Sequence, residues 1–408
     1  MLPLIALRNL ARNRRRTVLS LSVVSFGFLA VLLTGGFVRQ SFSGLSEALI
    51  RGGLGHLEVA PGNPEDPTAQ TGKPPAFENW QHVRTMIEGR GDVRAAGATI
   101  QFAGVATHGA QTASVVGLGI EPDREQRIGT DVRIRDGANL PADAAAGDPA
   151  ALLGMGLARA LAAKPGDTIT LMAATPDGSL NAMDVLVVGL FTTGIQELDA
   201  RMIKTRLADA QLLLGTEKVT SLIVGLTSAG ITASVAGDLR RAIASSSPAL
   251  GVADWESRAP FYGQVRGLYV GIFAFLGTIV AVLVTLSTSN TMLMSVLERV
   301  REFGMLLAIG TSRSQIGQLL VLEAIWLSVI GCAVGSVAGV IAVMAINGIG
   351  IKMPPPPGAV DPIDLALMVK GADFALIFAG LTVVLIAGTI PPLMRVFRLK
   401  IVEALSHI

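Results

Sequence analysis

Residues 267–297 read GLYVGIFAFLGTIVAVLVTLSTSNTMLMSVL, which is 31 consecutive residues without a charged side chain. An α-helix rises about 1.5 Å per residue, so about 20 apolar residues are enough to cross the hydrocarbon core of a bilayer. The run therefore predicts a membrane-spanning helix, which we place at residues 269–288. The charged sequence ERVRE follows it directly at residues 298–302.

Three other stretches have the same character. Residues 17–38 and 374–394 carry no charge. Between Arg313 and Lys352 the only charged residue is Glu323. The first stretch is longer than the apolar segment of a typical signal peptide, and no convincing small-x-small cleavage sequence follows it. We therefore expect an uncleaved anchor and, in total, a membrane α-helical protein with four transmembrane helices.

The composition agrees with extensive contact with lipid. Charged residues make up 16% of the 408 residues, against about 25% in soluble proteins, and the mean hydropathy is +0.56. The formal net charge of the chain is +2. Residues 40–265 contain 24 acidic and 18 basic side chains, a net charge of −6, and the rest of the chain has a net charge of +8. Since the basic excess accompanies the apolar segments, we expect membrane anchoring and no nucleic-acid partner. The single cysteine, Cys332, excludes an internal disulfide bond.

Lysine and arginine in the short flanks of the spans indicate orientation, because they are enriched in cytoplasmic segments. The short loop on the opposite side has only Lys352 and Lys370. We therefore expect both termini in the cytoplasm and residues 40–265 outside. The basic residues on the cytoplasmic side are Arg8, Arg12, Arg14, Arg15, Arg16, Arg299, Arg301, Arg313, Arg395, Arg398 and Lys400.

The sequence divides into three parts: an N-terminal helix with the first span (1–39), a soluble domain (40–265) and the remaining spans (266–408). Valine-rich alternation bounded by Gly and Asp in the soluble domain is typical of strands, so we expect an α+β domain inserted between the first and second spans. Its middle, about residues 104–206, is expected as a second subdomain. The predicted strands are 55–61, 97–105, 111–116, 168–172, 184–188 and 221–226, and the predicted helices are 78–89, 154–163 and 233–245.

No motif for catalysis or metal binding stands in the soluble domain. The patterns HExxH, CxxC, GxSxG and GxxxxGK[ST] are absent, and Gly72-Lys73 lacks the preceding glycine of a phosphate loop. We expect no catalytic, cofactor-binding or metal-binding residue in this chain. The four histidines, which lack ligand spacing, are His56, His82, His108 and His407.

The segment after the second span predicts an amphipathic helix. Phe303, Leu306, Leu307 and Gly310 follow the i, i+3, i+4, i+7 spacing of one helical face. At its start, Glu298 can pair with Arg301, or Glu302 with Arg299. By physics alone, such a helix lies in the membrane interface or inserts into a groove of a soluble partner.

Several motifs resemble one family. The sequence SVLERVREFGMLLAIG (295–310) and the ending PPLMRVFRLKIVEAL (391–405) resemble the FtsX-like permease domain of MacB-type ABC transporters. ALRNL (6–10) followed by RRRT (14–17) resembles the amphipathic N-terminal helix of these transporters. GHLEV (55–59) resembles the start of the periplasmic domain in the lipoprotein-releasing LolC/LolE branch.

The resemblance implies a permease in the bacterial inner membrane, with a periplasmic domain and no enzyme activity of its own. A homo- or heterodimer of such permeases is expected to bind separate cytoplasmic ATPase subunits, which hold ATP and Mg. By the same resemblance, a coupling helix docks on the ATPase. Its residues are Glu298, Arg299, Arg301, Glu302, Phe303, Gly304, Leu307 and Gly310.

Three functions follow from this resemblance. The first is release of lipoproteins or another amphiphile from the membrane, with the loop at residues 62–75 as a candidate contact for a periplasmic carrier. The second is export of peptides or drugs through a periplasmic adaptor, as in MacB, and the third is regulation of a periplasmic hydrolase, as in FtsX. Candidate residues for lateral substrate access between the first two spans are Phe26, Phe37, Tyr262, Tyr269 and Phe273.

The third span contains one acidic residue and three regularly spaced glycines, and a run of prolines follows it. Glu323 either faces a cavity in a dimer or sits at headgroup depth, and we favour the second. Gly331, Gly335 and Gly339 permit close helix packing, which we expect within one protomer. Residues 354–357 are four prolines, expected as a rigid connector.

Overall fold

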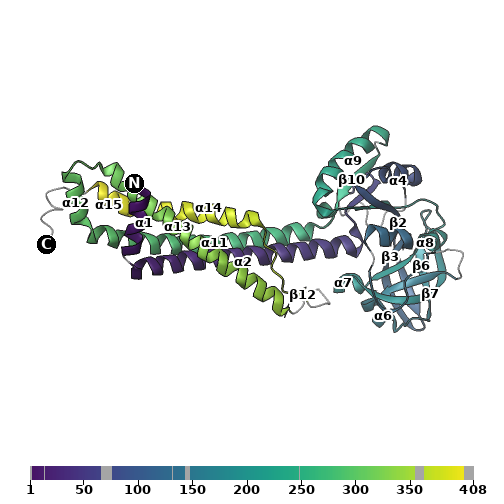
Figure 1. Cartoon of the computed structure of the whole chain (residues 1–408). Coiled ribbons are helices and arrows are strands. Elements are labelled where there is room, and N and C mark those ends of the chain that lie inside the picture. The colour runs from purple at the N-terminus through teal and green to yellow at the C-terminus, as the bar shows by residue number, and fades with distance from the viewer. Residues whose placement is uncertain are drawn as a thin grey trace. The chain divides into compact units, whose positions relative to one another are not determined.

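The computed structural model describes residues 2–12, 14–65, 76–130, 132–142, 148–247, 249–353 and 363–398. The chain forms two compact units (Figure 1). We call the first, made of Met1–Phe42, Arg266–Met353 and Asp364–Ile408, the helical unit. We call the second, which contains Ser43–Val265, the sheet unit.

Some features singled out in the sequence lie outside the described residues. These are the proline run 354–357, residues 66–75 of the proposed carrier loop, His407 and the terminal motif at 401–405.

In the described part of the chain, four helices are long and apolar enough to cross a membrane, with mean hydropathies of 2.2 to 2.5 over their apolar windows. They contain the four stretches that the sequence predicts as spans. The first and second are also longer than a bilayer requires, since α2 has 36 residues and α11 has 39. The helices that build the helical unit are α1 (Leu2–Arg12), α2 (Arg14–Leu49), α11 (Pro260–Glu298), α12 (Val300–Ala308), α13 (Arg313–Ile349), α14 (Gly371–Gly388) and α15 (Ile390–Phe397).

Three glycines of α13, Gly331, Gly335 and Gly339, pack closely against α2. We call this contact the glycine seam. A Cβ atom at any of them would lie closer to α2 than real Cβ atoms approach other atoms. The seam is reinforced by the Ser25 hydroxyl, which donates a 2.8 Å hydrogen bond to the Gly331 carbonyl. The expectation of close packing within one protomer is therefore confirmed. The contacts of the added Cβ are Gly331 to Val24 at 2.7 Å, Gly335 to Phe28 at 2.9 Å and Gly339 to Leu32 at 2.5 Å.

Polar contacts join the same spans at the end opposite to α1. The Arg39 guanidinium of α2 forms an ion pair with Asp373 in the first turn of α14, with one N–O distance of 2.6 Å. The Asn347 side chain of α13 binds both backbone groups of Leu367, at 2.8 and 3.2 Å. These contacts fix the helix ends where the apolar surface stops.

The sheet unit is built on one ten-stranded sheet. Its strand order is β10-β1-β9-β2-β3-β8-β5-β7-β4, and β6 pairs with both β2 and β7. The long strand β2 pairs with β9 through its first half and with β3 and β6 through its second half, so the sheet is continuous across the two regions that the sequence suggested as subdomains. The strands are β1 (Leu57–Pro61), β2 (Val93–His108), β3 (Gln111–Ile120), β4 (Arg133–Gly137), β5 (Ala150–Gly154), β6 (Thr168–Ala174), β7 (Leu180–Thr192), β8 (Met202–Arg206), β9 (Ser221–Leu226) and β10 (Leu250–Asp254).

Short helices cover this sheet, and apolar residues of both fill one large core. The core includes Ile100 of β2, Leu171 of β6 and Leu239 of α9, all fully or almost fully buried. The helices are α4 (Trp80–Glu88), α5 (Pro122–Ile128), α6 (Met155–Leu161), α7 (Gln196–Asp199), α8 (Leu207–Leu214), α9 (Thr232–Ser246) and α10 (Trp255–Arg258). Two further short segments are β11 (Lys352–Met353) and β12 (Ile363–Asp364).

The glycine seam makes a prediction about stability. Gly335→Ala places a methyl group 2.9 Å from Phe28 and from the Ser25 carbonyl, so we expect a loss of about 1–3 kcal/mol and a lower Tm in detergent. Gly348→Ala in the same helix is the control, because no atom lies within 4 Å of its added carbon. Alanine favours helix over glycine by about 1 kcal/mol, so the control should be neutral or stabilised. Equal shifts of Tm in both variants would show that the seam is not tightly packed.

Candidate functional site

The predicted coupling segment is a turn followed by a helix. The helix α11 ends at Glu298, and Arg299, with φ −106° and ψ 13°, is the one residue between it and α12. After α12, Gly310 takes φ +100°, a left-handed conformation that suits glycine, and the chain reverses. The Ser312 hydroxyl then accepts a hydrogen bond from the Gln315 N–H at 3.2 Å and starts α13.

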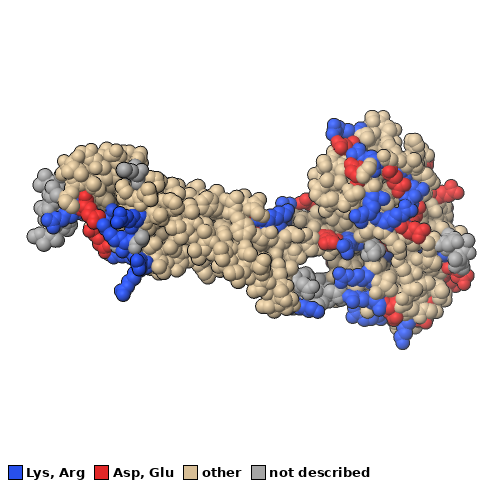
Figure 2. Space-filling model, in the orientation of Figure 1, with Lys and Arg blue, Asp and Glu red and all other residues tan. Residues whose placement is uncertain are grey.

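A network of ion pairs surrounds this turn. Arg12 of α1 binds Glu302 of α12 with N–O distances of 2.8 and 3.1 Å. Arg16 of α2 binds Glu298 at 2.5 and 2.7 Å. Figure 2 shows basic and acidic side chains gathered here, whereas the middle of the helical unit has no charged side chain on the face in view. The predicted pair of Glu302 with Arg299 is present, but Glu298 pairs with Arg16 instead of Arg301.

Arg299 joins the network to the interior of the bundle. Its guanidinium binds Glu302 at 2.9 Å and lies 3.4 Å from the carboxylate of Glu323 in α13. Glu323 is buried and also accepts a 2.8 Å hydrogen bond from Asn9 of α1. Its carboxylate therefore faces partners of its own chain. Hydrogen bonding from Arg299, and after it from Arg12, lowers the pKa of Glu302, which keeps this carboxyl ionised at neutral pH.

The apolar face predicted for α12 points into the helical unit. Phe303 is fully buried and belongs to a cluster with Val296, Ile316, Leu320 and Val396. Leu306 and Leu307 are partly buried against the same cluster, and Gly304 is buried as well. These residues position α12, because burying an aromatic ring among aliphatic side chains is strongly favourable.

The opposite face of α12 is exposed. Met305 is 51% exposed and Ile309, which follows the helix, is 79% exposed. Arg301 and Ala308 are exposed beside them. Met305 and Ile309 lie outside the apolar face predicted from the sequence, because Phe303, Leu306 and Leu307 form the more regular apolar pattern.

The candidate access residues fall in different surroundings. The rings of Tyr269 and Phe273 of α11 pack at a tilt, 6.1 Å apart between centroids, and Phe42 of α2 meets Tyr269 edge-on at 5.6 Å. Phe26 is exposed on α2, and Phe37 is partly buried. Tyr262 is different, since it lies in the part of α11 that belongs to the sheet unit, is 7% exposed and packs edge-on against Trp255 of the same unit. Phe42 is the member of the aromatic group that sequence reasoning missed.

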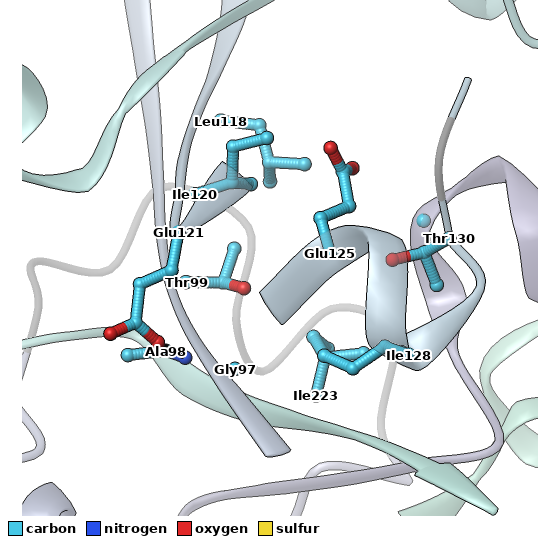
Figure 3. A pocket seen from close by; sticks show the side chains of 11 residues that line it. Gly97, Ala98, Thr99, Leu118, Ile120, Glu121, Glu125, Ile128, Thr130 and Ile223 are labelled. Carbon is cyan, nitrogen blue, oxygen red and sulfur yellow. Dashed lines mark hydrogen bonds between the residues drawn. The ribbon is translucent and has the colours of Figure 1, made fainter. Parts of the chain in front are cut away.

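A pocket in the sheet unit is too small to bind a substrate. In Figure 3, Glu125 rises from α5 beside Thr130 and the β3 residues Leu118 and Ile120. The cavity is about 20 Å³, enough for about one water molecule. Glu125 is also committed to an ion pair with Lys204, whose side chain is fully buried. In the described part of the chain, no cluster of His, Cys, Asp and Glu could hold a metal ion.

The chain enters and leaves the sheet unit through two neighbouring strands. A π-helical turn, η1 (Ile50–Leu54), leads from α2 to β1, and β10 leads through α10 to α11. The strands β1 and β10 pair antiparallel, with Leu57 opposite Asp254. Arg258 lies 2.5 Å from the buried carboxylate of Glu58 and donates to the Leu54 carbonyl at 3.3 Å.

His56 completes this junction. Its Nδ1 accepts a 3.3 Å hydrogen bond from the Leu226 N–H, and its carbonyl accepts one from the Trp255 N–H at 3.2 Å. Burial, and after it the charge of Arg94, lowers the pKa of His56, so the ring is neutral at neutral pH.

Comparison with protein families assigns both units. Residues 17–242 match the MacB-like periplasmic core domain, and residues 271–401 match the FtsX-like permease C-terminal domain. The chain belongs to the FtsX/MacB family of ABC transporter permeases. Such permeases work with an ATPase partner, and nothing in the family assignment gives this permease an enzyme activity of its own.

Two known permeases are similar in sequence to this permease. It is 25% identical over 355 residues to the lipoprotein-releasing system transmembrane protein LolC of Neisseria meningitidis serogroup B, covering 83% of this chain and 80% of that protein. The ABC transporter permease YtrF of Bacillus subtilis is 36% identical over 61 residues, which is 15% of this chain and 14% of YtrF.

Two solved structures are also similar to the permease. The extracellular domain of the ABC-type transporter YknZ from Gram-positive bacteria has a TM-score of 0.36 and 16% identity, covering 48% of this chain and 99% of that chain. The periplasmic region of MacB from Actinobacillus actinomycetemcomitans has a TM-score of 0.38 and 11% identity, covering 51% and 92%.

The junction predicts a pH dependence of stability. Because the pKa of His56 is lowered by folding, the unfolded chain takes up a proton below about pH 6.5 before the folded chain does. Stability is therefore lost as the pH falls through about 6.5 towards the lowered pKa that His56 has in the folded chain. His56→Asn keeps an acceptor for the Leu226 N–H and removes the titration, so the Tm of the full chain should depend less on pH. The exposed His82→Asn is the control, and an unchanged pH slope in His56→Asn would contradict the assignment.

Proposed function

We propose that this permease releases lipoproteins or a similar amphiphile from the inner membrane, driven by a separate cytoplasmic ATPase. The observation that carries the proposal is the extent of the similarity to LolC, which runs through 83% of the chain and is not confined to the transmembrane helices. In this proposal both termini and α12 are cytoplasmic, the sheet unit is periplasmic, and the functional complex contains two permeases.

The exposed face of α12 is the proposed docking surface for the ATPase. Met305 and Ile309 form an apolar centre, and Arg301 provides charge beside it. Exposed apolar side chains bordered by charge are typical of protein interfaces, and a short helix inserting into a groove is a common mode of docking. Phe303 and Leu307 act in this proposal by holding the helix in place.

The proposed path for transmission of movement starts at Arg299. A force on α12 reaches the buried Glu323 of α13 through Arg299, because separating these two side chains would leave buried charges unpaired. The exposed pair of Glu302 with Arg12 links α12 to α1. The helix α11 then continues from Glu298 to Pro260 and ends beside α10 of the sheet unit. The aromatic group of Phe42, Tyr269 and Phe273 lines the proposed lateral access between α2 and α11.

The docking surface can be tested by substitution. Met305→Asp and Ile309→Asp should each weaken ATPase association about 30-fold or more, since central apolar residues of an interface contribute about 2 kcal/mol or more. Both side chains are exposed, so insertion and Tm should be unchanged. The control is Leu180→Asp, at a leucine of the sheet unit that is 75% exposed. Association is measured by co-purification in mild detergent, and full retention of the ATPase by both variants would refute the proposed surface.

The substrate is tested in proteoliposomes that contain the permease, its ATPase and a triacylated lipoprotein. We expect release of the lipoprotein that requires ATP and is strongly reduced with Met305→Asp. Because residues 17–242 match the MacB-like periplasmic core domain, export is the second candidate function. If the permease is an exporter, a periplasmic adaptor should co-purify with it. Stimulation of a periplasmic hydrolase without release of lipoprotein would instead identify a regulator.

A further inference from the structure

The helix α1 has one buried face and one exposed face. Ala6 is fully buried, and Asn9 and Leu10 point into the helical unit, where Asn9 binds Glu323 and Leu10 packs on the apolar cluster of the spans. On the other face, Leu4 is 74% exposed and Ile5 is 47% exposed. A helix that exposes apolar side chains beside basic ones is typical of helices that lie at a membrane interface.

The five arginines between positions 8 and 16 fall into two sets. Arg12 and Arg16 are held by Glu302 and Glu298. The other three, Arg8, Arg14 and Arg15, are exposed and form no hydrogen bond or ion pair with any other residue in the described part of the chain.

The unpaired arginines lie at the border of the apolar surface. In α2, Val18 and Leu19 are 60% and 61% exposed, as expected of side chains that face lipid. Arg14 and Arg15 precede them by four residues and therefore lie on the same faces of the helix, one turn closer to its start. A cationic turn followed by an apolar turn matches the change from phosphate headgroups to acyl chains in one leaflet.

We infer that α1 and the first turn of α2 form a binding surface for anionic phospholipid headgroups. Arg8, Arg14 and Arg15 bind the headgroup phosphates, and Leu4 and Ile5 enter the boundary between headgroups and acyl chains. A second copy of the chain or the ATPase surface would satisfy the leucine and isoleucine, but neither explains why the free cations align with the lipid-facing residues of α2.

This surface is connected to the coupling helix. The helix α1 carries Arg12, the partner of Glu302, and the first turn of α2 carries Arg16, the partner of Glu298. Anionic lipid that fixes α1 thereby fixes both carboxylates that border the turn at Arg299. Coupling to the ATPase therefore depends on anionic lipid, a consequence that rests on the proposed function.

Lipid binding is tested first, without any activity. The full chain is purified in detergent with a mixture of phosphatidylglycerol and phosphatidylcholine, and the retained lipid is measured by native mass spectrometry. The wild type should retain phosphatidylglycerol preferentially, and the combination Arg8→Gln, Arg14→Gln and Arg15→Gln should lower that retention about tenfold or more. The control combination with the same change in charge is Arg127→Gln, Arg159→Gln and Arg241→Gln in the sheet unit, which should behave as wild type.

Two results would overturn the inference. One is equal retention of both lipids by the wild type, which needs no variant and is independent of folding. The other is unchanged retention by the glutamine triple, particularly if that triple loses the ATPase, which would assign the arginines to a protein interface. Lysine at the same three positions keeps the charge and should retain the lipid as the wild type does. Retention by the lysine variant but not by the glutamine variant would show that the loss is caused by the missing charge and not by failed membrane insertion.

The regulatory consequence is tested in nanodiscs that hold the permease–ATPase complex. Phosphatidylglycerol should raise ATPase activity several-fold over phosphatidylcholine alone in the wild type but not in the glutamine triple. Arg12→Gln should keep lipid retention and lose the response of the ATPase. If no ATPase binds any variant, the proposed function fails while the retention result stands; if the ATPase binds and ignores lipid, the regulatory link is wrong.

Discussion

Arg299 holds the position of α12. It occupies the only non-helical position between α11 and α12, and its guanidinium is shared by Glu302 and Glu323. Charges removed from water are costly unless they are paired, so each partner restricts the others. Because Glu323 also accepts a hydrogen bond from Asn9 of α1, moving α1 or the turn at Arg299 away from α13 would leave the buried carboxylate of Glu323 with fewer partners. The pair of Arg12 with Glu302, whose side chains are 55% and 42% exposed, adds little to this constraint. These contacts fix the orientation of α12 in the helical unit and therefore determine which of its faces is exposed.

The sequence was sufficient for the features that depend on local composition. Absence of charge over 20 or more residues gave the four spans, and alternation gave strands such as β6, whose residues are alternately exposed and buried. The strands β5 and β8 were missed for different reasons. All five residues of β5 are buried, so no alternation exists, and β8 contains Lys204 and Arg206, which are buried only because Glu125 and Asp209 neutralise them. Such pairing depends on the tertiary structure and leaves no local pattern.

The sequence predicted which segment forms the candidate docking helix, but not which of its side chains are exposed. The apolar stripe through Phe303 was recognised, yet a stripe does not state what it packs against, and its own chain supplies that partner. The break at Arg299 is also invisible in the sequence, since arginine is a good helix former. The pairs of Arg12 with Glu302 and Arg16 with Glu298 join positions 290 and 282 residues apart. Only the folded bundle brings them together.

The pairing of β1 with β10 has an evolutionary consequence. With Leu57 opposite Asp254, a domain of about two hundred residues begins and ends at the same place on its own edge. Its loss, enlargement or replacement therefore changes one short stretch of chain on each side, and the four helices keep their packing. One set of membrane helices can in this way carry different domains at the same insertion point, which Glu58, Arg258 and His56 border.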